Sequence, residues 1–114
     1  MASPVLTIDV AHPPRRPDEV EGELLEAWSQ IRNSSSLRIL KIIHGYGSSA
    51  RGGSTKDLVR NWIFRNRTKF RDTIHGEDYG LYQTVTQEMR KEVGRYTDPD
   101  MDSGNAGITI VWVK

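Results

Sequence analysis

The chain of 114 residues contains no cysteine, and its apolar runs are short. The missing cysteine excludes disulfide bonds, thiolate catalysis and cysteine-ligated zinc, and it favours a cytoplasmic location. No stretch approaches the roughly 18 apolar residues of a membrane helix, so we expect no membrane association. The first ten residues, MASPVLTIDV, lack the basic region and long apolar run of a signal peptide. These absences leave a single globular domain as the expectation.

The net charge of +1 conceals an uneven distribution of charge along the chain. Residues 51–71 contain seven lysines and arginines but only one acidic residue, Asp57, which is a local charge of +6. Residues 72–103 contain three basic and eight acidic residues, a local charge of −5. A basic segment beside a glycine-rich loop can bind phosphates. It can equally be a solvated helix face that the acidic segment offsets.

Hydrophobic periodicity predicts strands that alternate with helices. We expect strands at residues 5–10, 37–43, 70–74 and 108–113, and helices that begin near Asp18, near Ser54 or Thr55, and at Gln83. Alternation of this kind argues for an α/β fold, here a compact β-α-β-α-β two-layer sandwich with a mixed, mostly parallel sheet. The last helix, expected at residues 83–96, falls in the acidic segment.

The glycine-rich loop at residues 45–53 does not match the common nucleotide-binding motifs. Residues 45–50 read GYGSSA, close to the dinucleotide fingerprint, but no acidic residue follows about 20 positions later at the end of a second strand. Gly47 and Gly52 have the spacing of a phosphate-binding P-loop, yet Gly53 stands where that loop requires lysine. His-x-x-x-His and Gly-x-Ser-x-Gly motifs are also absent, so a dedicated zinc site or an α/β-hydrolase nucleophile is not expected.

Four stretches together resemble the Smr (small MutS-related) domain. They read IDVAH at residues 8–12, HGYG at residues 44–47, KDLVRNWI at residues 56–63 and GNAGITIVWVK at residues 104–114. The corresponding Smr motifs are Leu-Asp-Leu-His-Gly, His-Gly-x-Gly or Thr-Gly-x-Gly, a helix with Lys or Arg before Val-x-x-Trp-Leu, and Gly-Gly-x-Gly-Ala-Thr-x-Val-x-Leu-Lys. The resemblance covers residues 1–114 as one Smr-like domain, apart from an inserted, acidic, partly helical segment at about 75–103.

The resemblance implies a fold similar to the C-terminal domain of translation initiation factor three. It also implies work on nucleic acid, because Smr domains bind DNA or RNA and several are endonucleases. Partners of the domain elsewhere include ribosomes and mismatch-repair proteins.

In Smr nucleases, the Asp and His of the Leu-Asp-Leu-His motif matter for cleavage. This chain keeps Asp9, but Ala11 stands where the family has His, and His12 comes one place late. Neighbouring side chains on a strand point to opposite faces, so His12 would not simply replace the missing His unless it lies past the end of the strand. His44 is a further candidate acid or base, because the free pKa of histidine is near 6.5.

The glycine loop and the helix that follows it are the expected phosphate contacts. Glycine lets a phosphate approach the backbone closely, and a helix N-terminus favours an anion. The candidate contacts are Gly45, Gly47, Arg51, Gly52, Gly53, Lys56 and Arg60. The alternative is that these glycines only shape a turn and that His44 is buried with its hydrogen bonds satisfied.

Three functions follow from this reading. The first is a module that binds DNA or RNA without cutting it, which Ala11 motivates. The second is an endonuclease in which Asp9 activates water and His44 or His12 moves protons, with Mg²⁺ or Mn²⁺ as an optional cofactor, although a single aspartate is a sparse ligand set. The third is a module for small phosphate ligands or protein interaction. We expect residues 75–103 to cover an edge of the sheet, or else to dock a partner or shield the basic face.

Overall fold

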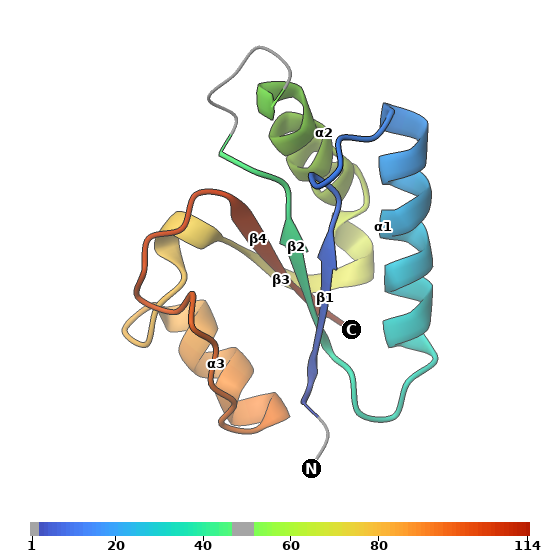
Figure 1. Cartoon of the computed structure of the whole chain (residues 1–114). Coiled ribbons are helices and arrows are strands. Elements are labelled where there is room, and N and C mark those ends of the chain that lie inside the picture. Colours follow the sequence, from blue (N-terminus) through green and yellow to red (C-terminus); the bar gives the residue numbers. More distant parts are fainter. Residues whose placement is uncertain (1–2, 47–51) are drawn as a thin grey trace.

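The computed structural model describes residues 3–46 and 52–114. Its helices and strands, in chain order, are β1 (Val5–Asp9), α1 (Pro17–Arg32), β2 (Ile39–Ile43), α2 (Gly52–Arg65), the short 3-10 helix η1 (Arg67–Lys69), β3 (Phe70–His75), the 3-10 helix η2 (Gly76–Asp78), α3 (Thr84–Val93) and β4 (Ile108–Val113). The strands form one four-stranded sheet, with α1 and α2 on one side and α3 on the other (Figure 1). None of the helices in the described part of the chain is long and apolar enough to cross a membrane.

The strand order is β1-β2-β4-β3, and the sheet is mixed, as predicted. β1 and β2 are parallel, with Asp9 opposite Ile43, whereas β4 lies between β2 and β3 and runs antiparallel to both. The expectation of a mostly parallel sheet is therefore wrong for the strand pairs, of which one is parallel and two are antiparallel. The reason is that the last strand of the chain inserts at the centre of the sheet and separates β2 from β3.

The sheet buries apolar side chains on both faces. Leu40 and Ile42 of β2 belong to the core under α1 and α2, and Ile39 belongs to a second core that contains Tyr79, Met89 and other residues of the chain after β3. Alternation of side chains along a strand explains this division. The fold thus has helices on both faces of the sheet, and the prediction of two layers is corrected to three.

The helix ends differ from the predictions by a few residues. The residue before α1 is Arg16, not Asp18, because Pro17 fits the first helical position and the Glu19 carboxylate accepts the Arg16 backbone N–H at 3.3 Å. α2 begins at Gly52, two residues before the first expected start. α3 ends at Val93, because Gly94 takes φ +99° there, so Tyr96 lies outside the helix.

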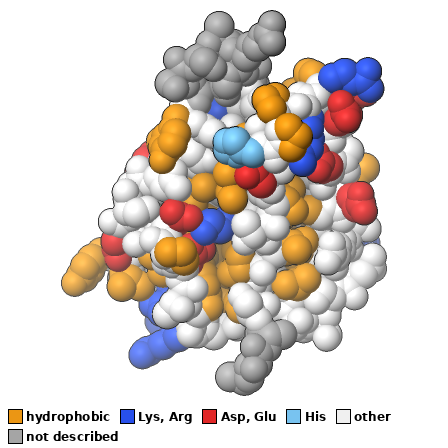
Figure 2. All heavy atoms as spheres, in the orientation of Figure 1, with side chains coloured by type: hydrophobic (Ala, Val, Ile, Leu, Met, Phe, Trp, Pro, Cys, Tyr) orange, Lys and Arg blue, Asp and Glu red, His pale blue; other side chains and the backbone are white. Residues whose placement is uncertain are grey.

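The segment at 75–103 covers a face of the sheet rather than an edge. Buried Tyr79 and Tyr96 share a hydrogen bond of 2.8 Å between their hydroxyl groups. Lys41 of β2 reaches the carboxylates of Asp98 and Asp100, with both N–O distances at 2.6 Å. On the face of the molecule drawn in Figure 2, acidic and basic side chains lie side by side. The acidic segment is therefore joined to the sheet by an apolar core and a buried ion cluster.

Candidate functional site

The carboxyl ends of β1 and β2 form the edge of the sheet that carries most of the predicted site. Because these strands are parallel, the turn after Asp9 and the residues His44 and Gly45 after β2 lie at the same edge. The backbone N–H groups of His44 and Gly45 both donate to the Gly107 carbonyl oxygen, at 2.9 and 3.1 Å. The start of α2 lies at this end of the molecule as well (Figure 1). We call this region the carboxyl edge.

Asp9 and His12 form a pair at the carboxyl edge. The Asp9 carboxylate accepts the backbone N–H groups of Ala11 and His12, at 2.8 and 3.0 Å, and its Oδ2 lies 3.0 Å from Nδ1 of His12. β1 ends at Asp9, so strand alternation no longer applies and the His12 ring turns back onto Asp9. Because His12 lies past the end of the strand, the objection from strand alternation no longer applies to it.

The environment of the pair suits proton transfer. Burial raises the pKa of Asp9, but the hydrogen bonds from Ala11 and His12 outweigh burial, and the net pKa is lowered. The ionised carboxylate holds the Nδ1 side of the imidazole, while the His12 side chain is 74% exposed. Nε2 of His12 forms no hydrogen bond with the described residues.

His44 is buried at 1% exposure with both ring nitrogens engaged. Nδ1 donates to the Gly45 carbonyl oxygen at 2.8 Å, and Nε2 therefore accepts the Thr109 hydroxyl, also at 2.8 Å. Burial lowers the pKa of His44, and the charges of Arg60 and Lys56 add to that effect against the hydrogen bond to Gly45. A neutral, fully bonded imidazole favours a role in holding the Gly45 turn over direct proton transfer.

Lys56 and Arg60 share an internal acidic partner. Arg60 donates to Glu77 through Nη2 at 2.7 Å and to the Thr109 hydroxyl oxygen through Nε at 3.0 Å. Lys56 Nζ lies 3.8 Å from the other Glu77 carboxylate oxygen. The hydrogen bond from Arg60 lowers the pKa of Glu77 to about 2, despite partial burial. The acidic segment therefore supplies a carboxylate to both of the helix cations predicted to contact phosphates.

The predicted glycines have different positions. Gly45 takes φ +85°, and a β-carbon there would lie 3.9 Å from that of Ala11, the residue at the family histidine position. Gly52 and Gly53 are the first residues of α2, whose first turn carries no acidic residue. The first N–H groups of a helix have no partner within it and favour an anion. Gly47 and Arg51 lie outside the described residues.

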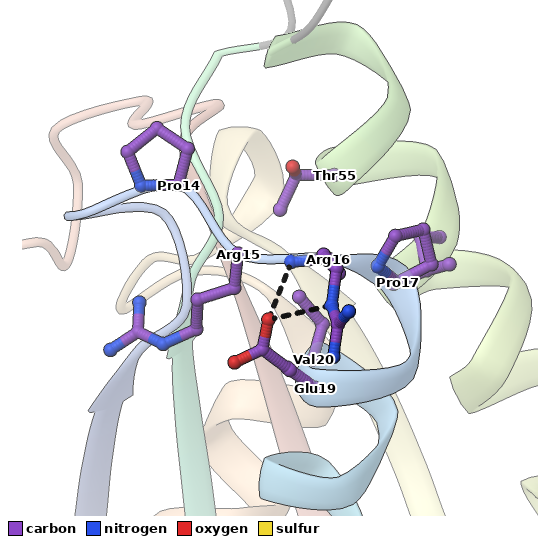
Figure 3. A pocket seen from close by; sticks show the side chains of 8 residues that line it. Pro14, Arg15, Arg16, Pro17, Glu19, Val20 and Thr55 are labelled. Atoms are coloured by element: carbon purple, nitrogen blue, oxygen red, sulfur yellow. Dashed lines mark hydrogen bonds and ion pairs between the residues drawn. The ribbon is translucent and has the colours of Figure 1, made fainter.

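A cleft of about 400 Å³ opens between the start of α1 and the first turns of α2 (Figure 3). The residues that line it are Pro14, Arg15, Arg16, Pro17, Glu19, Val20, Thr55 and Leu58. Arg15 pairs with Glu23 at 2.8 Å, and Arg16 pairs with Glu19 at 3.2 Å while its side chain stays 76% exposed. Sequence reasoning missed these arginines, although the HPPRRP turn directly follows the strand that ends at Asp9.

The candidate residues do not fit a divalent metal centre. Within residues 3–46 and 52–114, no group of three or more histidine and carboxylate side chains comes together in a way that could hold a metal ion. The Asp9 carboxylate is occupied by two backbone N–H groups and the His12 ring. We therefore derive no step through Mg²⁺ or Mn²⁺.

The fold places the chain among domains of a known architecture. The structure is similar to the crystal structure of the Smr domain of Thermus thermophilus MutS2, with a TM-score of 0.56, 15% sequence identity and 96% of each chain covered. No protein-family model and no curated protein sequence matches the chain. The chain therefore has an Smr-like fold, which the structural comparison establishes without support from overall sequence identity.

Proposed function

We propose that this Smr-like domain binds DNA or RNA at the carboxyl edge through the phosphate backbone. One observation carries the proposal. The first turn of α2, which contains no acidic residue, borders the cleft that Arg15 and Arg16 line at that edge. Helix N–H groups and guanidinium groups both suit phosphate oxygens. The Smr-like fold supports a nucleic-acid-related role in addition.

The contacts proposed here differ from those expected from the sequence. Lys56 and Arg60 are engaged by Glu77, so a phosphate reaches them only by displacing that carboxylate. Arg16 also pairs with Glu19, but its side chain is 76% exposed, so Arg16 and the Thr55 hydroxyl, which both line the open cleft next to the start of α2, are the readier contacts. Gly52 and Gly53 have no β-carbon to keep a phosphate from the backbone. Such contacts position nucleic acid without reading its sequence.

A second candidate function is cleavage of the bound strand, which the Asp9–His12 pair favours. In RNA, Nε2 of His12 would accept the proton of a 2′-hydroxyl, whose oxygen then forms a bond to the adjacent phosphorus as the 5′-oxygen leaves with a proton from solvent. Asp9 would hold the ring and stabilise the imidazolium that forms. His44, being buried, would support the site through the Gly45 turn.

Fluorescence anisotropy with labelled single-stranded RNA, single-stranded DNA and duplex DNA tests the binding proposal. We expect Arg15→Ala/Arg16→Ala to weaken binding about 10-fold, since a hydrogen bond to a charged group contributes roughly 1.5 kcal/mol. Lys91→Ala/Arg95→Ala, which removes two exposed cations near the end of α3, is the matched control and should leave affinity unchanged. Equal effects from both double variants, or no binding by the unaltered protein, would overturn the proposal.

Cleavage of the same RNA, followed on denaturing gels, tests the second candidate. Asp9→Asn and His12→Ala should abolish product formation while binding changes less than about 2-fold, because neither residue lines the cleft. Intact RNA after incubation with protein that binds it would leave a binding module without cleavage.

A further inference from the structure

The seven cations of residues 51–71 do not form one surface. α2 has 14 residues and is therefore about 21 Å long. Lys56 lies in its first half, toward the carboxyl edge, and Arg60 lies just past its middle, whereas Lys69 belongs to η1, beyond the other end of the helix. The basic segment thus serves two regions at opposite ends of α2.

The second region surrounds Trp28. The Arg32 guanidinium carbon lies 5.3 Å from the centre of the Trp28 ring, and Lys69 Nζ lies 4.6 Å from it. Lys114, which follows β4, lines the same shallow cavity of about 310 Å³. Three cations from α1, η1 and the segment after β4 thus meet around one half-buried aromatic ring, and no acidic side chain of the described residues lines the cavity. We call these four residues the Trp28 surface.

The cations of the Trp28 surface differ from Lys41, Lys56 and Arg60 in having no internal counter-charge. Lys41 is paired with two aspartates, and Lys56 and Arg60 share Glu77. Arg32, Lys69 and Lys114 form no ion pair with any carboxylate in the described ranges. Bringing like charges together costs free energy, which the electron-rich face of Trp28 offsets only in part.

A purely structural role explains one of the three cations. Arg32 lies in the last turn of α1, where a positive charge stabilises the helix dipole. Lys69 and Lys114 lie outside α1. Their convergence on the same cavity fits an external anion.

We propose that the Trp28 surface binds a second stretch of the nucleic-acid backbone that is held at the carboxyl edge. Nucleic acid suits it better than a membrane, because the Trp28 ring is half-buried beneath Arg32 and Lys69 and does not project to enter a bilayer. α1 has 16 residues, so the two regions are about 24 Å apart along this helix. At a rise of about 3.4 Å per nucleotide along the axis, a helically stacked strand spans that distance with roughly seven nucleotides, and an extended strand spans it with fewer. The inference rests on the proposed function for the identity of its ligand.

A grid of variants tests the Trp28 surface separately from the carboxyl edge. Binding of a 3-nucleotide and a 20-nucleotide strand is measured between about 50 and 200 mM salt, the range over which phosphate contacts weaken clearly with salt. The proteins are the unaltered chain, Arg32→Gln/Lys69→Gln, Arg15→Ala/Arg16→Ala and the combination. Lys91→Gln/Arg95→Gln is the control for charge, and thermal unfolding checks that each variant is folded.

We expect Arg32→Gln/Lys69→Gln to weaken binding of the longer strand about 10-fold and to lower the salt slope by about 1.4, at roughly 0.7 per phosphate contact on a single strand. The 3-nucleotide strand, too short to reach both regions even when it is extended, should lose less than about 2-fold. Unchanged affinity and slope in that folded variant, with the carboxyl-edge variant impaired, would overturn the inference and leave the proposed function standing. Failure of the unaltered chain to bind any strand would overturn both. Binding to phosphatidylserine vesicles that falls in the Trp28-surface variant, without any loss of strand binding, would assign the surface to a membrane instead.

Discussion

Glu77 connects the acidic segment to the two helix cations that a phosphate would contact. Its carboxylate lies 2.7 Å from Arg60 Nη2 and 3.8 Å from Lys56 Nζ, so it occupies the place of a bound anion. One alternative from the sequence is that residues 75–103 shield the basic face. The contacts with Arg60 and Lys56 identify Glu77 as the residue of that segment that would do so. If Glu77 competes with phosphate, removing its charge should improve binding.

We therefore predict that Glu77→Gln tightens nucleic-acid binding about 3-fold to 10-fold, since it frees up to two cations for phosphate contact. Anisotropy at fixed salt measures the change, and Asp78→Asn, the exposed neighbouring carboxylate, is the matched control for net charge. Equal affinities of Glu77→Gln and the unaltered chain would mean that Lys56 and Arg60 serve the fold alone.

The same residue also predicts how stability depends on pH. The pKa of Glu77 is lowered from its ordinary value near 4.5 to about 2 in the folded state, chiefly by the hydrogen bond from Arg60. Because the folded pKa is depressed, the stabilisation is present above pH 4.5 and is lost as pH falls toward 2. Urea unfolding of Glu77→Gln and the unaltered chain should differ at pH 6 and converge near pH 2. A constant difference across that range would contradict this linkage.

In the turn after β2, the site requires the positive backbone φ angle of Gly45. Its φ of +85° is costly for any residue with a side chain, although a β-carbon would meet only the Ala11 β-carbon at 3.9 Å, an ordinary contact. Gly45→Ala should therefore lower the free energy of unfolding by about 1 to 2 kcal/mol through backbone conformation alone. Gly22→Ala in the exposed middle of α1, where nothing lies within 4 Å of the new carbon, should raise it by about 0.5 to 1 kcal/mol. Urea midpoints of the two variants that shift in the same direction would contradict this account.

The elements themselves were largely predictable from the sequence, and their arrangement was not. Periodicity located β3 and β4 to within a residue: the β4 run ITIVWV is apolar or β-branched throughout, whereas β3, with the sequence FRDTIH, gave only a weak strand signal. It did not reveal that β4 would pair with both β2 and β3, since strand order depends on contacts between distant residues. Similarly, motif spacing found Asp9 and His12, but only the fold shows that the turn after β1 returns His12 to Asp9. Glu77, Arg16 and Thr55 were missed as site residues because they become neighbours of the site through packing.

Considered as a whole, the molecule depends on the acidic segment to complete the core on one face of the sheet. Lys41 lies in the middle of β2 with its side chain 9% exposed, and it is neutralised by Asp98 and Asp100 from the loop after α3. Burial lowers the pKa of Lys41, but its bonds to Asp100 and Asp98 outweigh burial and raise it, so the amine stays charged. Asp98 also accepts the Tyr79 hydroxyl at 3.3 Å, which ties this cluster to the second core.

Removing one partner from this cluster should therefore destabilise the whole domain. Asp98→Ala leaves the Lys41 ammonium with one carboxylate and the Tyr79 hydroxyl with one partner fewer, and we expect a loss of about 3 kcal/mol in the free energy of unfolding. Asp57→Ala, which removes an exposed carboxylate from α2, should change stability by less than about 0.5 kcal/mol. If the segment were an independent appendage, Asp98→Ala would loosen residues 75–103 in hydrogen exchange while β1 and α1 kept their protection. Because Lys41 lies on a central strand between β1 and β4, we expect the amides of β1, β2 and β4 to lose protection together with the segment.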